Sequence, residues 1–119
     1  MMAELKIENI VDEFYVVDFT SPEFSEITLF TGRKTGKKAR PYFDIKKADG
    51  YRFLANKDQV ITSSYFLGLI GDELLEILSN VKDINELLKH VNTESLNETS
   101  KNECVRAIKR GLRTQSPTL

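Results

Sequence analysis

The sequence predicts a small single-domain α/β fold, a sheet with helices packed on one face. Short segments rich in β-branched and aromatic residues lie in the first half of the chain. Longer segments with apolar residues at three- and four-residue spacing lie in the second half. Strands followed by helices are typical of such a layered domain. A length of 119 residues suits one core, so we expect a domain over residues 1–112 and a flexible tail over 113–119.

The first predicted strand is the aromatic and β-branched run 14–19. It ends at 20–22, because Pro22 lacks the amide that a sheet ladder needs and favours extended geometry in the residue before it. A short second strand is expected at 27–30.

Two glycines, Gly32 and Gly36, predict a loop over residues 31–36. Residues 37–43 remain open between a helical turn and a strand, with Pro41 arguing against a long helix. The pair Asp49–Gly50 predicts a turn before a third strand at 51–54.

A strand ending at Val60–Ile61 is expected to feed directly into a long amphipathic helix. Ser63 or Ser64 occupies the N-cap position of this helix, where a serine oxygen accepts from a free backbone amide. The apolar side chains that recur at helical spacing are Phe66, Leu67, Ile70, Leu74, Leu75 and Leu78.

Two glycines lie on one face of the long helix, Gly68 and Gly71, and they are expected to let it approach the sheet closely. Asn80 predicts its end. Segment 84–91 is either helix or strand, segment 92–95 has the composition of a loop, and a last helix is expected over about 97–112.

Composition limits the function classes. With 40% hydrophobic and 29% charged residues and a net charge of −1, the chain is neither disordered nor a general polyanion binder. The single cysteine, Cys104, falls on an apolar stripe and is expected in the core, and His90 has no second histidine for a metal site. No carboxylate spacing singles out an acid/base pair. We therefore expect a non-enzymatic protein without metal or cofactor.

The sequence also predicts a soluble, cytoplasmic protein with no membrane partner. No run approaches the roughly 18 to 20 apolar residues of a membrane span. The segment MMAELKIENI is too acidic and its apolar run too short for a secretory signal. A lone cysteine suits a reducing compartment.

The stretch DQVITSSYFLGLIGDELLEI, followed by LLKHVNTESLNETSKNECVRAIKRGL, resembles STAS domains over roughly residues 50–112. In that family a strand delivers a serine to the start of a helix. Bacterial anti-sigma-factor antagonists of the family carry Asp-Ser-Ser-Gly there, where this chain has Thr62–Ser63–Ser64–Tyr65. The resemblance implies a regulatory module that binds a protein partner and is switched by serine phosphorylation, with Ser63 as the acceptor.

The hydroxyl cluster Thr62, Ser63 and Ser64 therefore has two interpretations. It is a helix cap, or it is a phosphoacceptor or anion site, since a helix N-terminus offers free amides and partial positive charge. Ser64 is the alternative acceptor.

A basic loop is expected over 32–40, with five cations and no acid: Arg33, Lys34, Lys37, Lys38 and Arg40. It is a solvated loop, a contact for a protein or nucleic acid, or, least well matched, a nucleotide site, since the Walker spacing is absent. The aromatics Tyr42, Phe43, Tyr51 and Phe53 are core residues or stack on bases. The leading hypothesis is a STAS-like protein-interaction module docked through the helix after Ser64. The alternative is a nucleic-acid-binding protein that uses the basic loop, and the sequence leaves the oligomeric state open.

Overall fold

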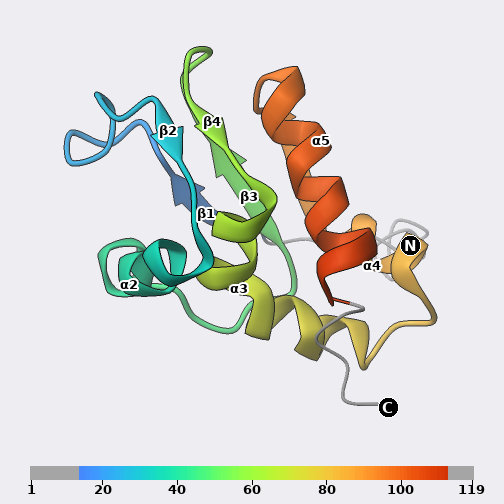
Figure 1. The fold of residues 1–119 in the computed structure, drawn as a ribbon. Helices are drawn as coiled ribbons and strands as arrows, with labels where there is room; N and C mark the ends of the chain where they lie inside the picture. The colour runs from blue at the N-terminus through green and yellow to red at the C-terminus, as the bar shows by residue number, and fades with distance from the viewer. Residues whose placement is uncertain (1–13, 113–119) are drawn as a thin grey trace, which may run out of the picture.

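The computed structural model describes residues 14–112, which form a small α/β fold (Figure 1). The strands are β1 (Tyr15–Asp18), β2 (Leu29–Phe30), β3 (Tyr51–Leu54), β4 (Val60–Ile61) and β5 (Val91–Ser95). The helices are α2 (Arg33–Phe43), α3 (Ser63–Leu78), α4 (Ile84–Leu88) and α5 (Glu98–Arg106), which continues as the π-helical turn η1 (Ala107–Gly111).

The strands form two parallel units. One is a three-stranded sheet in the order β1-β3-β5, and the other is the pair β2-β4. Tyr15 lies opposite Tyr51 in the first unit, and Leu29 lies opposite Val60 in the second. Parallel strands require crossover connections, so the helices between them lie against the sheet.

Helices cover one face of the three-stranded sheet, as the sequence predicts. Val17 and Phe53 are fully buried, whereas their neighbours Val16 and Arg52 on the opposite face are exposed. In Figure 1, α2, α3 and α5 lie on the viewer's side of the sheet. This alternation is the period of two expected where one face of a sheet meets a core.

Aromatic side chains join the strands to α2 and α3. The ring of Phe19 lies 4.8 Å, centroid to centroid, from both Phe30 and Phe43. Phe53 of β3 meets Phe66 of α3 edge to face at 5.1 Å. These rings pack where strands and helices meet, and the buried residues form one continuous cluster.

Helices α2 and α3 cross in backbone contact. A methyl group added at Gly36 would overlap the carbonyl of Tyr65, and one added at Gly68 would overlap the carbonyl of Arg33. The expectation that Gly68 lets α3 approach the sheet closely is therefore wrong, because the element approached at Gly68 is α2. Gly68 faces α2, because the atoms nearest to an added methyl group are backbone atoms of Arg33 and Lys37.

Predictions of irregular structure are also wrong at two places in the chain. The expected loop at 31–36 and basic loop at 32–40 are mostly helix α2, which begins at Arg33. Its buried side holds Gly36, Ala39 and Phe43, and packing on α3 offsets the weak helix preference of glycine. Residues 92–95, expected as loop, belong to β5, because the free edge of β3 supplies hydrogen-bond partners to a polar segment.

The other predicted elements are confirmed within a residue or two. They include β1, β3, β4, the long helix α3 and the last helix, while segment 84–91 divides into α4 and the start of β5. The predicted tail, 113–119, lies outside the described residues. Within residues 14–112, none of the helices has the length and apolar character needed to cross a membrane.

Candidate functional site

Strand β4 feeds α3 directly, and Thr62 caps the helix. Its Oγ1 accepts a hydrogen bond from the backbone amide of Tyr65 at 3.4 Å and donates to the carbonyl of Phe30 at 3.1 Å. The prediction that Ser63 or Ser64 is the N-cap is therefore wrong by one or two positions. Thr62 takes the role because its backbone is extended, as a capping residue requires, and it directly precedes the first helical residue.

The hydroxyl of Ser64 ties α3 to the start of α2. Its Oγ accepts from the amide of Gly32 at 3.1 Å and lies 3.2 Å from Thr62 Oγ1. The single proton of Thr62 goes to the Phe30 carbonyl, so Ser64 donates to Thr62. Two of the three hydroxyls thus hold β2, Gly32 and α3 together.

Ser63 differs from its neighbours. Within residues 14–112 its hydroxyl has no hydrogen-bond partner, and its backbone amide donates to Glu103 Oε1 at 2.7 Å. Glu103 comes from α5, so a carboxylate already occupies the positive end of α3. No sequence pattern indicates this contact, because the two residues lie 40 positions apart.

The five predicted cations all lie on α2 but fall into two groups. Arg33, Lys34, Lys37 and Lys38 are exposed, and none forms an ion pair with another residue of the described chain. Arg40 lies on the side of the helix that faces α3. The structure therefore separates Arg40 from the other four.

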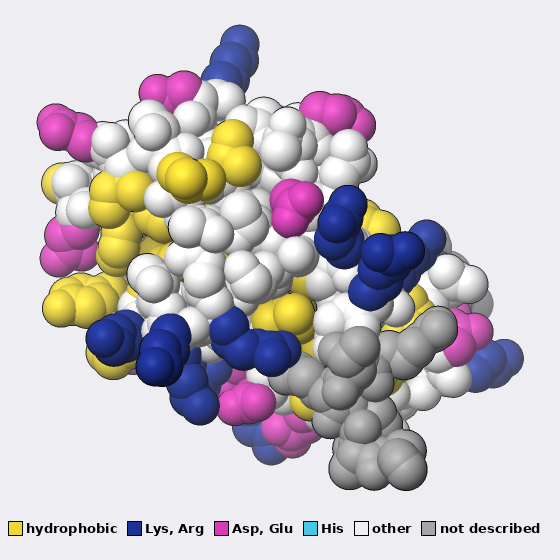
Figure 2. All heavy atoms as spheres, in the orientation of Figure 1, with side chains coloured by type: hydrophobic (Ala, Val, Ile, Leu, Met, Phe, Trp, Pro, Cys, Tyr) yellow, Lys and Arg dark blue, Asp and Glu magenta, His cyan; other side chains and the backbone are white. Residues whose placement is uncertain are grey.

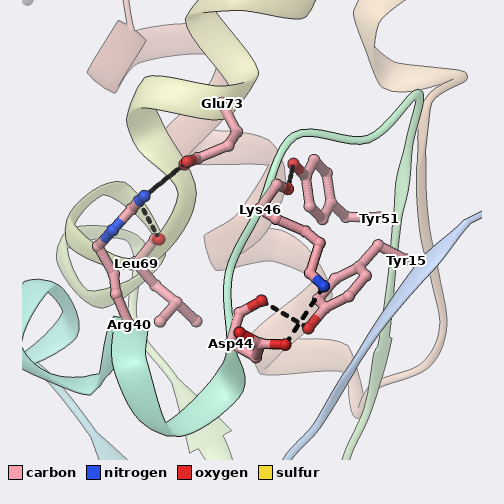
Figure 3. A network of polar contacts seen from close by, with 7 residues as sticks. All are labelled: Tyr15, Arg40, Asp44, Lys46, Tyr51, Leu69 and Glu73. Carbon is pink, nitrogen blue, oxygen red and sulfur yellow. Dashed lines mark hydrogen bonds and ion pairs between the residues drawn. The ribbon is translucent and has the colours of Figure 1, made fainter.

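Arg40 makes a two-point ion pair with Glu73 of α3 (Figure 3). Its Nη1 and Nη2 donate to the two carboxylate oxygens at 2.7 and 2.6 Å, and Nη1 also donates to the carbonyl of Leu69 at 2.8 Å. The side chains of Arg40 and Glu73 are only 26% and 11% exposed. Burial alone would raise the pKa of Glu73, but the hydrogen bond and charge of Arg40 bring that pKa below its ordinary value.

A pocket of about 480 Å³, lined by both polar and apolar residues, adjoins this ion pair. Lys47 and Glu76 pair across it at 2.6 Å, and His90 Nδ1 lies 2.6 Å from the carbonyl of Asp49. The Tyr51 hydroxyl donates to the carbonyl of Lys46 at 2.5 Å, and burial raises the Tyr51 pKa (Figure 3). These polar groups hold one another, and within residues 14–112 no His, Cys, Asp and Glu cluster suits a metal.

An apolar groove of about 470 Å³ lies on the opposite side of α2, between this helix, β2 and the 20–28 loop. Tyr42 and Leu29 on its walls are 68% and 58% exposed, and Ile27 is also exposed. Figure 2 shows apolar side chains over the β2 region and basic side chains over α2. The lining residues are Phe24, Ile27, Leu29, Phe30, Thr31, Thr35, Lys38, Ala39, Tyr42 and Tyr65.

The loop wall of the groove is fixed by one buried side chain, Gln59. Its Nε2 lies 2.9, 2.9 and 3.1 Å from the carbonyls of Phe19, Phe24 and Ile27, so its two N–H groups are shared among these three acceptors. Its Oε1 accepts from the amide of Asn56 at 2.7 Å. A fully buried amide with its hydrogen-bond capacity used in this way defines the loop conformation, so the groove is preformed.

Sequence reasoning did not identify the groove. Of the four aromatics weighed as core or base-stacking residues, Phe43, Tyr51 and Phe53 are buried, and only Tyr42 is exposed. Cys104 is buried as predicted, and burial raises the pKa of its thiol to about 12. Comparisons with protein-family models, curated proteins and solved structures found no match to this chain.

Proposed function

We propose that this chain is a non-enzymatic, STAS-like regulatory module that binds a protein partner in the groove between α2 and β2, and not through the helix after Ser64, because the apolar side of that helix, α3, is buried. The observation that carries the proposal is the exposure of Ile27, Leu29 and Tyr42 around one preformed apolar groove. Large apolar side chains gathered on a surface are typical of sites that another molecule covers. Aromatic residues such as Tyr42 are enriched in protein interfaces because they bury much area at low entropic cost.

Charge indicates the chemistry of the partner. Lys38 lines the groove, and Lys34 lies one helical turn before it on the same exposed side of α2. Neither lysine is neutralised within the described chain, so both attract acidic groups. Glu23 and Glu26 are exposed on the loop side of the groove. A partner segment is therefore expected to place its acids toward α2.

Ser63 is the residue through which phosphorylation would act in this proposal. Among the residues that the structure describes, its hydroxyl has no hydrogen-bond partner, and Glu103 lies at its backbone amide. A phosphate on Ser63 would repel the Glu103 carboxylate and compete with it for the start of α3. The modification would then loosen the contact between α5 and α3 and alter partner binding through that change.

The test is a capture experiment from the native host with matched variants. Wild type is expected to retain a protein that Leu29→Asp/Tyr42→Asp loses, because two charges would enter the apolar groove. Arg52→Glu on the open face of the sheet is the control and should retain it. Equal capture by all three proteins would contradict the groove as the docking site.

The same four exposed cations of α2 also fit the alternative, a nucleic-acid contact. A titration with a single-stranded oligonucleotide at several salt concentrations separates the two functions. Steeply salt-dependent binding that is lost in Lys34→Glu/Lys38→Glu would favour nucleic acid. We expect only weak binding that does not depend on the apolar groove residues.

A further inference from the structure

We propose that the partner segment is an extended peptide, with acidic and apolar residues in alternation, that adds as a new strand to the free edge of β2. This inference rests on the proposed function and specifies the conformation of the bound segment. The groove contributes apolar contact, the edge contributes backbone hydrogen bonds, and the lysines of α2 contribute charge.

The hydrogen bonds of β2 show which of its groups are free. The amides of Val60 and Thr62 donate to the carbonyls of Thr28 and Phe30, both at 2.9 Å. Backbone groups alternate in direction along a strand, so the amide and carbonyl of Leu29 point away from β4. No group within residues 14–112 bonds to them. Leu29 therefore offers one donor and one acceptor at an exposed edge.

An unpaired edge beside an apolar groove favours an extended occupant. A strand laid along β2 satisfies both free groups of Leu29 and directs every second side chain to one face. A helix satisfies its own backbone and leaves both groups of Leu29 without a protein partner. The pair β2-β4 is short, with two residues in each strand, so side-chain contacts must supply much of the affinity.

The alternating side chains of such a strand match the surface on either side. Apolar residues on one face contact Leu29, Ile27 and Tyr42 in the groove. The residues between them remain in solvent at the rim, where the exposed lysines Lys34 and Lys38 attract acidic groups over a screening distance of about 8 to 10 Å. Acidic residues suit these positions, whereas lysine there would be repelled.

The probe is a random-peptide display library selected on the whole chain. We expect the enriched peptides to alternate apolar and acidic residues. Synthesised copies should bind Lys34→Glu/Lys38→Glu at least about tenfold more weakly than wild type, a difference of about 1.4 kcal/mol. Copies with lysine in place of each acid should not bind wild type.

Two substitutions at one position isolate the backbone hydrogen bond. Leu29→Ala removes the side chain and keeps the amide, whereas Leu29→Pro also removes the amide. Proline is tolerated at an edge strand when its missing amide faces solvent, so both variants should keep the β2-β4 pairing. We expect Leu29→Pro to bind the selected peptide at least several-fold more weakly than Leu29→Ala.

Amide exchange in the unmodified protein provides a measurement that does not depend on the folding of the proline variant. The Leu29 amide should exchange rapidly in the free protein and slowly with the peptide bound. Rapid exchange in the saturated complex would overturn the strand model, as would equal affinities of Leu29→Pro and Leu29→Ala.

Enriched peptides with helical spacing that still require Leu29 and Tyr42 would leave the proposed function in place and overturn only the extended conformation. Selection of no groove-dependent peptide would overturn both.

Discussion

The two sides of α2 carry the same kind of charge for different purposes. On the side that faces α3, Arg40 is held by Glu73 and the carbonyl of Leu69, and the helix backbones touch at Gly36 and Gly68. On the opposite side, Lys34 and Lys38 extend into solvent beside an apolar groove. One helix thus joins a rigid interface to an open surface. A charge is structural where another element desolvates and pairs it, and it is available to a partner where nothing does.

The largest loss of stability is expected when the backbone contact between α2 and α3 is disrupted. Gly68→Ala would drive a methyl group into the carbonyl of Arg33, and backbone atoms cannot rotate away. Overpacking of this kind outweighs the gain of about 1 kcal/mol in helix propensity, so we expect a net loss of about 2 to 3 kcal/mol in the free energy of unfolding.

Denaturant titration measures this loss, and Gly111→Ala is the matched control. The added methyl group at Gly111 meets the side chain of Leu67, which can change rotamer. Its loss should be clearly smaller. Equal losses in the two variants would mean that helix separation is not the cause.

The second test compares two cations two positions apart on α2. Arg40→Ala leaves the poorly exposed carboxylate of Glu73 without its partner and should cost about 2 to 3 kcal/mol. Lys38→Ala should change the stability by less than about 0.5 kcal/mol. Denaturant midpoints of both variants check the contrast, and a similar cost for the two would remove the distinction between the sides.

This ion pair should also contribute a pH dependence. The pKa of Glu73 is lower in the folded chain than its ordinary value of 4.5, so its contribution to stability is present above that value. The contribution is lost as pH falls through the lower folded pKa. The stability difference between wild type and Glu73→Gln should therefore shrink on acidification below about pH 4.5. A difference that stays constant from pH 7 to pH 3 would contradict the ion pair.

The smallest effects are expected at the hydroxyls that join α3 to the start of α2. Thr62→Ala removes the cap and the bond to Phe30, and should cost about 1 to 2 kcal/mol. Ser64→Ala should cost about 1 kcal/mol through the lost bond from Gly32. Ser63→Ala should cost less than about 0.5 kcal/mol.

A charge at Ser63 sharpens the same series. Ser63→Asp places a carboxylate beside Glu103 and should destabilise the chain more than Ser63→Ala. The effect should be relieved in the Glu103→Gln background, where the acceptor remains without its charge. Thermal melts measure both, and an equal effect of Ser63→Asp in the two backgrounds would show that Glu103 does not control this position.

The local sequence pattern was enough to locate the elements whose apolar residues recur regularly or cluster. The run Phe14–Phe19 is aromatic and β-branched, and the helix after Val60–Ile61 has six apolar residues in phase, so both elements could be located from the sequence. The same holds for Cys104, whose place on an apolar stripe predicts burial. The exposure of Lys34, Lys37 and Lys38 likewise follows from the cost of burying unpaired cations.

Only the tertiary structure decided the rest, because the causes lie far away in the sequence. Residues 33–36 become helix because Gly36 fits against Tyr65, and residues 92–95 become strand because β3 offers an edge. The cation Arg40 becomes structural through Glu73, 33 positions away. The start of α3 is occupied through Glu103, and the groove is shaped by Gln59. Periodicity indicates which side of an element is apolar, but it carries no information on which distant group contacts that side. The candidate site depends on those long-range contacts.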